Sequence, residues 1–141
     1  NAPSISDTSG APYYDIDFIG GFDAIFNDKF IQPNFYINFS PFNDVDCWVN
    51  ISGKSMSPLI AHGDIVALKK IDNWSDFIPF GEIYAIVTDQ FRTVKIITEG
   101  TKEDTLTLMP YNKSDEFKPQ QIPIKLIKGL FAVRGTVKKF F

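Results

Sequence analysis

The stretch that decides the fold is Ser52-Gly53-Lys54-Ser55-Met56-Ser57-Pro58, a serine in a tight turn bounded by glycine and proline. Eight positions after Ser55 begins Gly63-Asp64-Ile65-Val66, a second turn that leads into an apolar run. Forty positions after Ser55, a lysine stands inside another apolar run, Val94-Lys95-Ile96-Ile97. A serine in a turn and a lysine in an apolar strand are the two catalytic groups that a serine–lysine hydrolase requires.

Length and composition bound the class of protein. The chain has 141 residues, which favours one domain, and 44% of them are hydrophobic, enough for a core. The formal net charge of −3 argues against a self-sufficient nucleic-acid surface. No apolar run approaches the roughly 18 residues of a membrane span, and no secretory signal opens the chain. The single cysteine, Cys47, excludes an internal disulfide. We therefore expect a cytoplasmic protein without membrane contact.

The apolar patterning predicts a mainly β fold with mixed antiparallel sheets and one or two short helices. Short alternating or β-branched runs are bounded by Gly, Pro, Asn or Asp, which is typical of strands. No alternation of strands with long helices occurs, which argues against a doubly wound α/β sheet. A short helix is predicted over 20–28. Strands are predicted over 34–40, 47–52, 65–71, 82–88, 93–98, 105–109, 122–127 and 130–140.

The ends of the chain suggest a domain with something before it. Residues 1–12 are small, polar and punctuated by Pro and Gly, so we interpret them as a linker or arm, with one domain over 13–141. The chain opens on Asn1 rather than an initiator Met, so we expect it to be part of a longer protein.

A serine hydroxyl becomes a useful nucleophile only when a neighbouring base takes its proton. The one histidine, His62, stands in a glycine-terminated loop seven positions after Ser55, where an exposed loop histidine is the favoured interpretation. One His and one Cys make no metal-ligand set, so we expect neither a metal nor a cofactor.

Lysine can replace histidine as the base when it is neutral, which requires its pKa of about 10.4 to fall through burial. Strand alternation places Lys95 on the face of Thr93 and Ile97, opposite Val94 and Ile96. Either face could be the buried one, and an exposed strand lysine is the alternative. The cluster around Ser55 could likewise be ordinary turn material. The serine turn, the Gly63-Asp64 turn and the strand lysine together favour the hydrolase interpretation over ordinary turn and surface residues.

The combined motifs resemble the C-terminal domain of LexA-type and phage repressor proteins, a group that includes UmuD-like proteins and shares its fold with bacterial signal peptidases. The resemblance covers roughly residues 12–139. The segments that carry it are Gly53-Lys54-Ser55-Met56-Ser57-Pro58, Gly63-Asp64-Ile65-Val66-Ala67, Gly81-Glu82-Ile83-Tyr84-Ala85-Ile86, Val94-Lys95-Ile96-Ile97, Met109-Pro110-Tyr111-Asn112, Glu116-Phe117-Lys118-Pro119 and 127–137.

The resemblance implies self-cleavage. In that family the serine attacks a peptide bond of its own chain, which makes Ser55 the nucleophile and Lys95 the general base and acid. Backbone N–H groups of the serine turn, including that of Ser55, would hold the oxyanion. A helix-turn-helix domain before this one would bind DNA, the protein would form a homodimer, and a RecA-type co-protease is a further expected partner.

The cleavage segment departs from the family pattern of Ala-Gly or Cys-Gly. By spacing, Ile19-Gly20 stands at that place, and Gly20-Gly21 is the alternative bond. A β-branched Ile in a pocket shaped for Ala would be overpacked at a cost of about 1–3 kcal/mol, unless the pocket is larger.

Two other functions compete with a self-cleaving repressor. The first is a non-cleaving dimerisation module of a helix-turn-helix regulator, in which the strand over 130–137 pairs at a sheet edge with a second copy, or else closes its own sheet. The second is a signal-peptidase-like protease, which a missing membrane span and Glu99-Gly100-Thr101 after the lysine disfavour.

Overall fold

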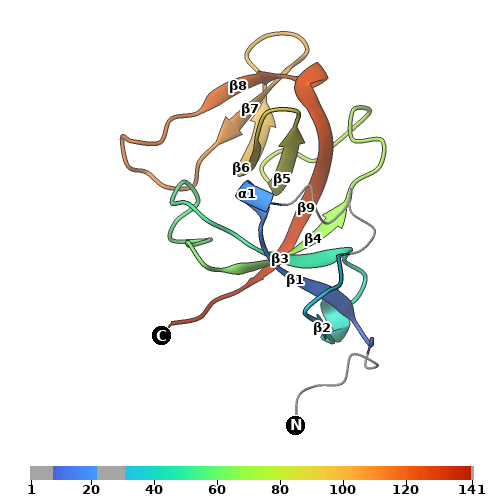
Figure 1. Ribbon diagram of the computed structural model, residues 1–141. Helices are drawn as coiled ribbons and strands as arrows, with labels where there is room; N and C mark the ends of the chain where they lie inside the picture. The colour runs from blue at the N-terminus through green and yellow to red at the C-terminus, as the bar shows by residue number, and fades with distance from the viewer. Residues whose placement is uncertain (1–7, 22–30, 141) are drawn as a thin grey trace.

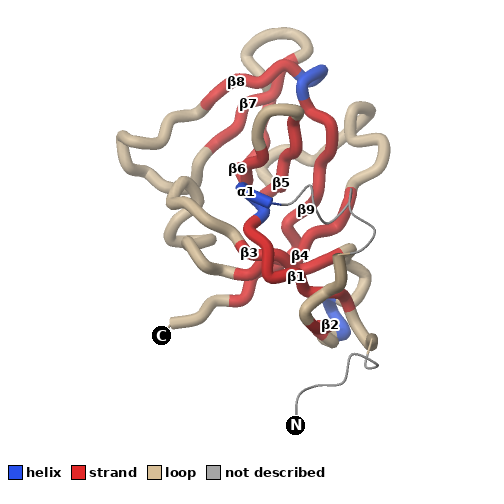
Figure 2. Tube along the Cα trace, in the orientation of Figure 1, coloured by secondary structure: helices blue, strands red, loops and turns tan. Residues whose placement is uncertain are grey.

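The computed structural model describes residues 8–21 and 31–140, and its strands form a single mixed sheet of nine (Figure 2). The order across the sheet is β2-β1-β3-β4-β9-β5-β6-β7-β8, and every neighbouring pair is antiparallel except β1 and β3. The elements are β1 (Ala11–Asp17), α1 (Phe18–Gly21), β2 (Phe35–Ile37), η1 (Ser40–Phe42), β3 (Cys47–Asn50), β4 (Ile65–Lys70), β5 (Ile83–Thr88), β6 (Arg92–Glu99), β7 (Thr105–Met109), β8 (Gln120–Pro123), η2 (Ile124–Leu126) and β9 (Ile127–Val137).

The mainly β prediction is confirmed, and the differences concern particular elements. β7 has the predicted bounds, whereas 122–127 ends in the 3-10 turn η2 rather than as one strand. β1 was not predicted as a strand, and it begins at Ala11, inside the segment interpreted as a linker. Ala11 and Tyr13 are buried in it while Asp15 is exposed, so Pro12 and the acidic residues mask a regular alternation. Of the predicted helix over 20–28, residues 22–28 lie outside the described part.

β9 lies in the middle of the sheet, so the expectation of an edge strand over 130–137 is wrong for its first part. Residues 127–132 pair with β5 on one side, and residues 131–137 pair with β4 on the other. Figure 1 shows β9 running past both groups of strands, with β5 to β8 beside its first half and β3 and β4 beside its second half. Beyond Ala132, no described strand pairs with the side of β9 that faces away from β4.

Apolar packing joins the two groups of strands. The core cluster that lies between them includes Phe18 of α1, Val66 of β4, Val94 of β6 and Phe131 of β9, each no more than 5% exposed. Burying a side chain of this size stabilises the fold by about 1.5–3 kcal/mol. α1 therefore packs on β6 beside the connection between β3 and β4. Among the described residues no helix is long and apolar enough to cross a membrane.

Candidate active site

The serine turn lies in the connection between β3 and β4. Gly53 has a φ of +94°, a conformation that favours glycine, and it begins the turn. The Ser57 N–H donates to the Lys54 carbonyl over 3.1 Å, and the Ile60 N–H donates to the Met56 carbonyl over 2.9 Å. Met56 is 3% exposed and packs into the core beneath the turn. The turn that carries Ser55 is therefore held by its own backbone hydrogen bonds and by the buried Met56 side chain.

The Gly63-Asp64 turn closes the base of this connection. The Ile51 N–H donates to the Asp64 carbonyl over 2.9 Å, and the Gly63 N–H donates to the Ile51 carbonyl over 2.8 Å. The buried Asp64 carboxylate accepts the Ala61 N–H at 2.8 Å and pairs with the Lys138 ammonium. A carboxylate that accepts hydrogen bonds in this way ties the segment after Ser55 to the end of β9.

Lys95 on β6 reaches Ser55 across the sheet. Its Nζ lies 2.9 Å from Ser55 Oγ, 2.7 Å from Thr93 Oγ1 and 3.3 Å from the Val94 carbonyl oxygen. Thr93 and Lys95 share a strand face, so the Thr93 hydroxyl contacts the Lys95 amine from within β6. The Ser55 hydroxyl contacts the same amine from the connection between β3 and β4. The structure therefore brings together the two side chains that the sequence singled out, at hydrogen-bond distance.

Burial lowers the pKa of Lys95 from its ordinary value of 10.5, because the protein interior disfavours the charged amine. Among the described residues no carboxylate pairs with the Lys95 ammonium, so no negative charge counteracts this effect. A lysine with a lowered pKa, hydrogen-bonded to a serine hydroxyl, is able to accept the serine proton.

The Ser55 amide N–H points to no acceptor among the described residues. Two nearby amides have acceptors, since the Gly53 N–H donates to His62 Nδ1 over 3.3 Å and the Ser57 N–H closes the turn, whereas the flanking Lys54 and Met56 amides, like that of Ser55, have none among the described residues. An unused backbone donor at the nucleophile is the group that an oxyanion hole requires.

A small cavity of about 20 Å³ adjoins Ser55, and Ile19 of the candidate cleavage segment lines it. That volume is close to the minimum for one water molecule, so the side chains nearly fill the space. Ile19 is half-buried, and its β-branched side chain packs against the core cluster in the wall of this cavity. The lining residues are Ile19, Ile51, Ser52, Gly53, Ser55, Met56, Ile60, Thr93 and Val94.

Two side chains hold the candidate cleavage segment in a helical turn. Asp17 Oδ1 accepts the Ile19 N–H at 3.1 Å, and its Oδ2 accepts the Ser52 hydroxyl at 2.6 Å. Arg92 donates from Nε to the Phe18 carbonyl over 3.0 Å and from its terminal nitrogen to the Ile19 carbonyl over 3.2 Å. The Ile19 carbonyl therefore faces Arg92 in this conformation, not the Ser55 N–H.

The other sequence-predicted residues have separate places. Gly20 is exposed and Gly21 half-buried at the end of α1. His62 is exposed, as expected of a loop histidine, and its imidazole contacts Gly53 rather than Ser55. Burial raises the pKa of the Cys47 thiol to about 12, which makes this cysteine a packing residue. Among residues 8–21 and 31–140, no three metal-ligating side chains gather.

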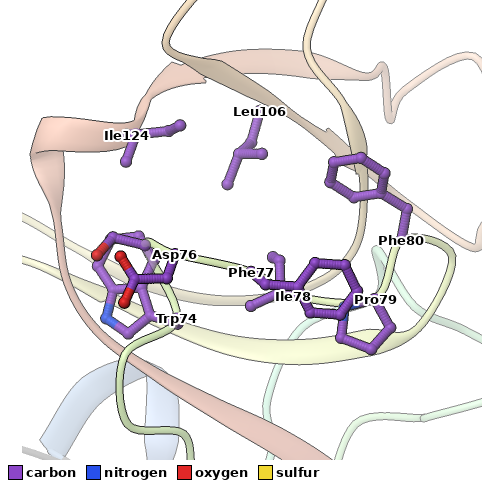
Figure 3. A pocket seen from close by; sticks show the side chains of 9 residues that line it. Trp74, Asp76, Phe77, Ile78, Pro79, Phe80, Leu106 and Ile124 are labelled. Atoms are coloured by element: carbon purple, nitrogen blue, oxygen red, sulfur yellow. The ribbon is translucent and has the colours of Figure 1, made fainter.

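A larger apolar groove of about 290 Å³ lies elsewhere, between the segment over 74–80 and the residues Leu106 and Ile124 (Figure 3). Phe77 and Phe80 are exposed at its rim, and Asp76 is its one ionisable side chain. The groove shares no lining residue with the cavity at Ser55. It therefore takes no part in the chemistry of Ser55 and Lys95.

A sequence model of the Peptidase S24-like family matches residues 16–137. The chain belongs to the Peptidase S24-like family. This is the family of peptidase-like C-terminal domains found in LexA, UmuD and phage repressors, so the resemblance found in the sequence is confirmed. No curated protein matches the chain.

Several residues of this Peptidase S24-like site escaped the sequence analysis as functional groups. They are Thr93, which contacts Lys95; Asp17 and Arg92, which hold the segment around Ile19; and Asn112, which contacts the serine turn. Two of them had a usable signal: strand alternation places Thr93 on the face of Lys95, and Asn112 ends the segment Met109-Pro110-Tyr111-Asn112 that carries part of the resemblance.

The lowered pKa of Lys95 predicts how replacing it changes stability. The folded chain binds the Lys95 proton less tightly than the unfolded chain does, so the free energy of unfolding rises with pH between the folded-state pKa and 10.5. We expect Lys95→Met to be more stable than the parent at pH 7, because methionine carries no charge to bury. This advantage should shrink as the pH approaches 10.5. Urea unfolding of both proteins at pH 7 and close to pH 10.5 measures this advantage. An equal stability difference between the two proteins at both pH values would contradict the lowered pKa of Lys95.

Proposed function

We propose that this chain is the C-terminal domain of a transcriptional repressor that cleaves itself at Ile19-Gly20 through Ser55 and Lys95. The observation that carries the proposal is the 2.9 Å separation of Ser55 Oγ and Lys95 Nζ, with the lysine buried and its pKa lowered. The position of Ile19 in the wall of the cavity at Ser55 supports the choice of substrate.

In the first step neutral Lys95 takes the Ser55 proton as Oγ attacks the Ile19 carbonyl carbon. The negative charge that develops on the carbonyl oxygen is held by the Ser55 N–H. The Lys95 ammonium then gives its proton to the Gly20 nitrogen, the C–N bond breaks, and Ile19 remains as an ester on Ser55. Thr93 keeps the amine aligned during both transfers.

In the second step water attacks the ester, and Lys95 takes the water proton. The ester bond breaks, Lys95 returns that proton to Ser55 Oγ, and Ile19 leaves as a carboxylic acid that loses its remaining proton to solvent. Both steps need Lys95 to be neutral before it acts, so the rate rises with pH through the lowered pKa.

The substrate is tethered, which compensates for a weak base. A bond held beside the nucleophile reacts as if it were present at very high concentration. The helical turn of α1 and the Arg92 contact oppose the reaction, because the Ile19 carbonyl must leave Arg92 to reach the Ser55 N–H. Release of this contact is the slow step, and a RecA-type co-protease would act there.

The same Arg92 contact supports the second candidate, a dimerisation module that does not cut. A regulator of this kind would form a homodimer in the cytoplasm and bind DNA through an upstream helix-turn-helix domain, with two copies on two half-sites. The side of β9 beyond Ala132 that faces away from β4 offers unpaired backbone groups for a second copy. Dimerisation itself is compatible with cleavage, so the homodimer is proposed whether or not the chain cuts itself.

Self-cleavage is tested by incubating the protein between pH 7 and 10 and measuring fragment masses. We expect first-order cutting after Ile19, faster at higher pH and independent of protein concentration. Ser55→Ala and Lys95→Ala should each lower the rate by about 10³-fold or more, because the nucleophile or its base is lost. Lys69→Ala is the matched control, since this half-buried strand lysine contacts the Asp44 carbonyl instead.

The masses also separate the two candidate bonds, because cutting at Gly20-Gly21 adds one glycine to the N-terminal fragment. A chain that stays intact at pH 10, or is cut equally when Ser55 is alanine, would sink the cleavage proposal and leave the dimerisation module.

Dimerisation through β9 is tested by hydrogen exchange at increasing protein concentration. The amides over 133–137 that point away from β4 should become protected in step with the dimer fraction measured by sedimentation. The amides over 127–132 serve as the control, because β5 already pairs with that part of β9. Concentration-dependent protection at the terminal strands β2 or β8 instead would place the interface elsewhere and contradict the assignment.

A further inference from the structure

Asn112 makes two hydrogen bonds to consecutive carbonyls of the serine turn. Its side-chain Nδ2 donates to the Lys54 carbonyl over 2.9 Å, and its backbone N–H donates to the Ser55 carbonyl over 2.9 Å. Asn112 stands three residues after the end of β7, and β7 pairs with β6, the strand of Lys95. The sheet therefore brings a second group to Ser55, which contacts its backbone rather than its hydroxyl.

The two contacts fix the peptide planes on either side of Ser55. In a planar trans peptide the C=O of one residue and the N–H of the next point in opposite directions. A hydrogen bond that sets the direction of the Lys54 C=O therefore sets the direction of the Ser55 N–H. The second hydrogen bond does the same for the peptide that links Ser55 to Met56.

The orientation of the Asn112 amide is itself determined. Its Oδ1 accepts the Ser114 N–H at 2.9 Å, so Nδ2 is the atom left to face the Lys54 carbonyl. The same carbonyl accepts the Ser57 N–H from within the turn. One bond from the turn and one from outside it hold the carbonyl in a single direction.

We propose that Asn112 is a positioning residue that aims the Ser55 N–H at the oxyanion. The inference rests on the proposed function, in which that N–H holds the negative charge. The Ser55 N–H has no acceptor among the described residues, so its direction is set by the hydrogen bonds to the Lys54 carbonyl, of which Asn112 donates the one from outside the turn. Lys95 governs protonation of the Ser55 hydroxyl, whereas Asn112 governs the geometry of its amide.

Two variants separate this role from a structural one. Asn112→Asp keeps the shape of the side chain and the Ser114 contact, and it replaces the donor that faces Lys54 with an oxygen that repels the carbonyl. Asn112→Ala removes the side chain and leaves the backbone contact to Ser55. Ser114→Ala is the matched control, because it removes the Ser114 Oγ that accepts the Glu116 N–H in the same loop and changes nothing at Ser55.

The first readout is the residual dipolar coupling of the Ser55 N–H, which reports the direction of that bond without any cleavage. We expect the coupling to change by at least half its value in both Asn112 variants and to stay unchanged in Ser114→Ala. Couplings in β4, β6 and β9 should stay constant in all three, which shows that the fold is intact. An unchanged Ser55 coupling in an otherwise folded Asn112→Asp protein would overturn the proposal.

The second readout is the rate of self-cleavage against pH. Both Asn112 variants should cut about 10- to 100-fold more slowly, a share of the 10²–10³-fold typical of losing an oxyanion donor. The midpoint of the pH profile should not move, since Lys95 is untouched. Cutting at the parent rate in both variants would overturn the proposal. A parent that never cuts, with the Ser55 coupling changed as expected, would refute the proposed function and leave the orienting role standing.

Discussion

The pairing of β9 with two strands at once is the constraint on which the site depends. At Ala132, β9 meets Lys69 of β4 on one side and Tyr84 of β5 on the other, and Tyr84 in turn meets Lys95 of β6. Ser55 belongs to the connection that leads into β4. The shared strand therefore fixes the distance between the segment that carries the serine and the strand that carries the lysine, although forty residues separate them in the sequence.

The chemistry of the site follows from where this constraint puts Lys95. An amine held among apolar side chains loses hydration, and without a carboxylate partner it gives up its proton more readily. The same burial costs stability, so Lys95 has no explanation as a fold-stabilising residue. Its contacts with Ser55, Thr93 and the Val94 carbonyl satisfy the amine without charging it. A buried lysine whose pKa is lowered can act as a base toward the hydroxyl beside it, and the segment around Ile19 lies next to this pair.

The sequence allowed the strands and the serine–lysine pair to be predicted, because both leave local patterns. The run over 105–109 alternates cleanly, and the turn around Ser55 combines glycine, proline and a following Gly63-Asp64. The sequence could not show that β9 is central in the sheet, because strand order depends on pairing between distant segments. β1 was missed since Pro12 and two aspartates disguise its buried positions, Ala11 and Tyr13.

The contacts that tune the site were beyond prediction for the same reason. Arg92 binds the Ile19 carbonyl from 73 positions away, and Asn112 binds the Lys54 carbonyl from 58 positions away. Arg92 stands in no motif, and the segment Met109-Pro110-Tyr111-Asn112, although it carries part of the resemblance, gives no sign that Asn112 contacts Lys54. The expected clash of Ile19 with a pocket shaped for alanine also depended on the fold, since besides Ile19 the cavity is lined by two distant segments, over 51–60 and 93–94.

The most direct test of the account is the titration of Lys95 itself, followed through the carbon next to its amine by NMR in the Ser55→Ala protein, which cannot cut itself. The account predicts an apparent pKa clearly below 10.5, since burial alone acts on the amine. A lysine that titrates at 10.5 or above would be almost entirely charged near pH 7, which would contradict the account, because Ser55 would then have no base at that pH.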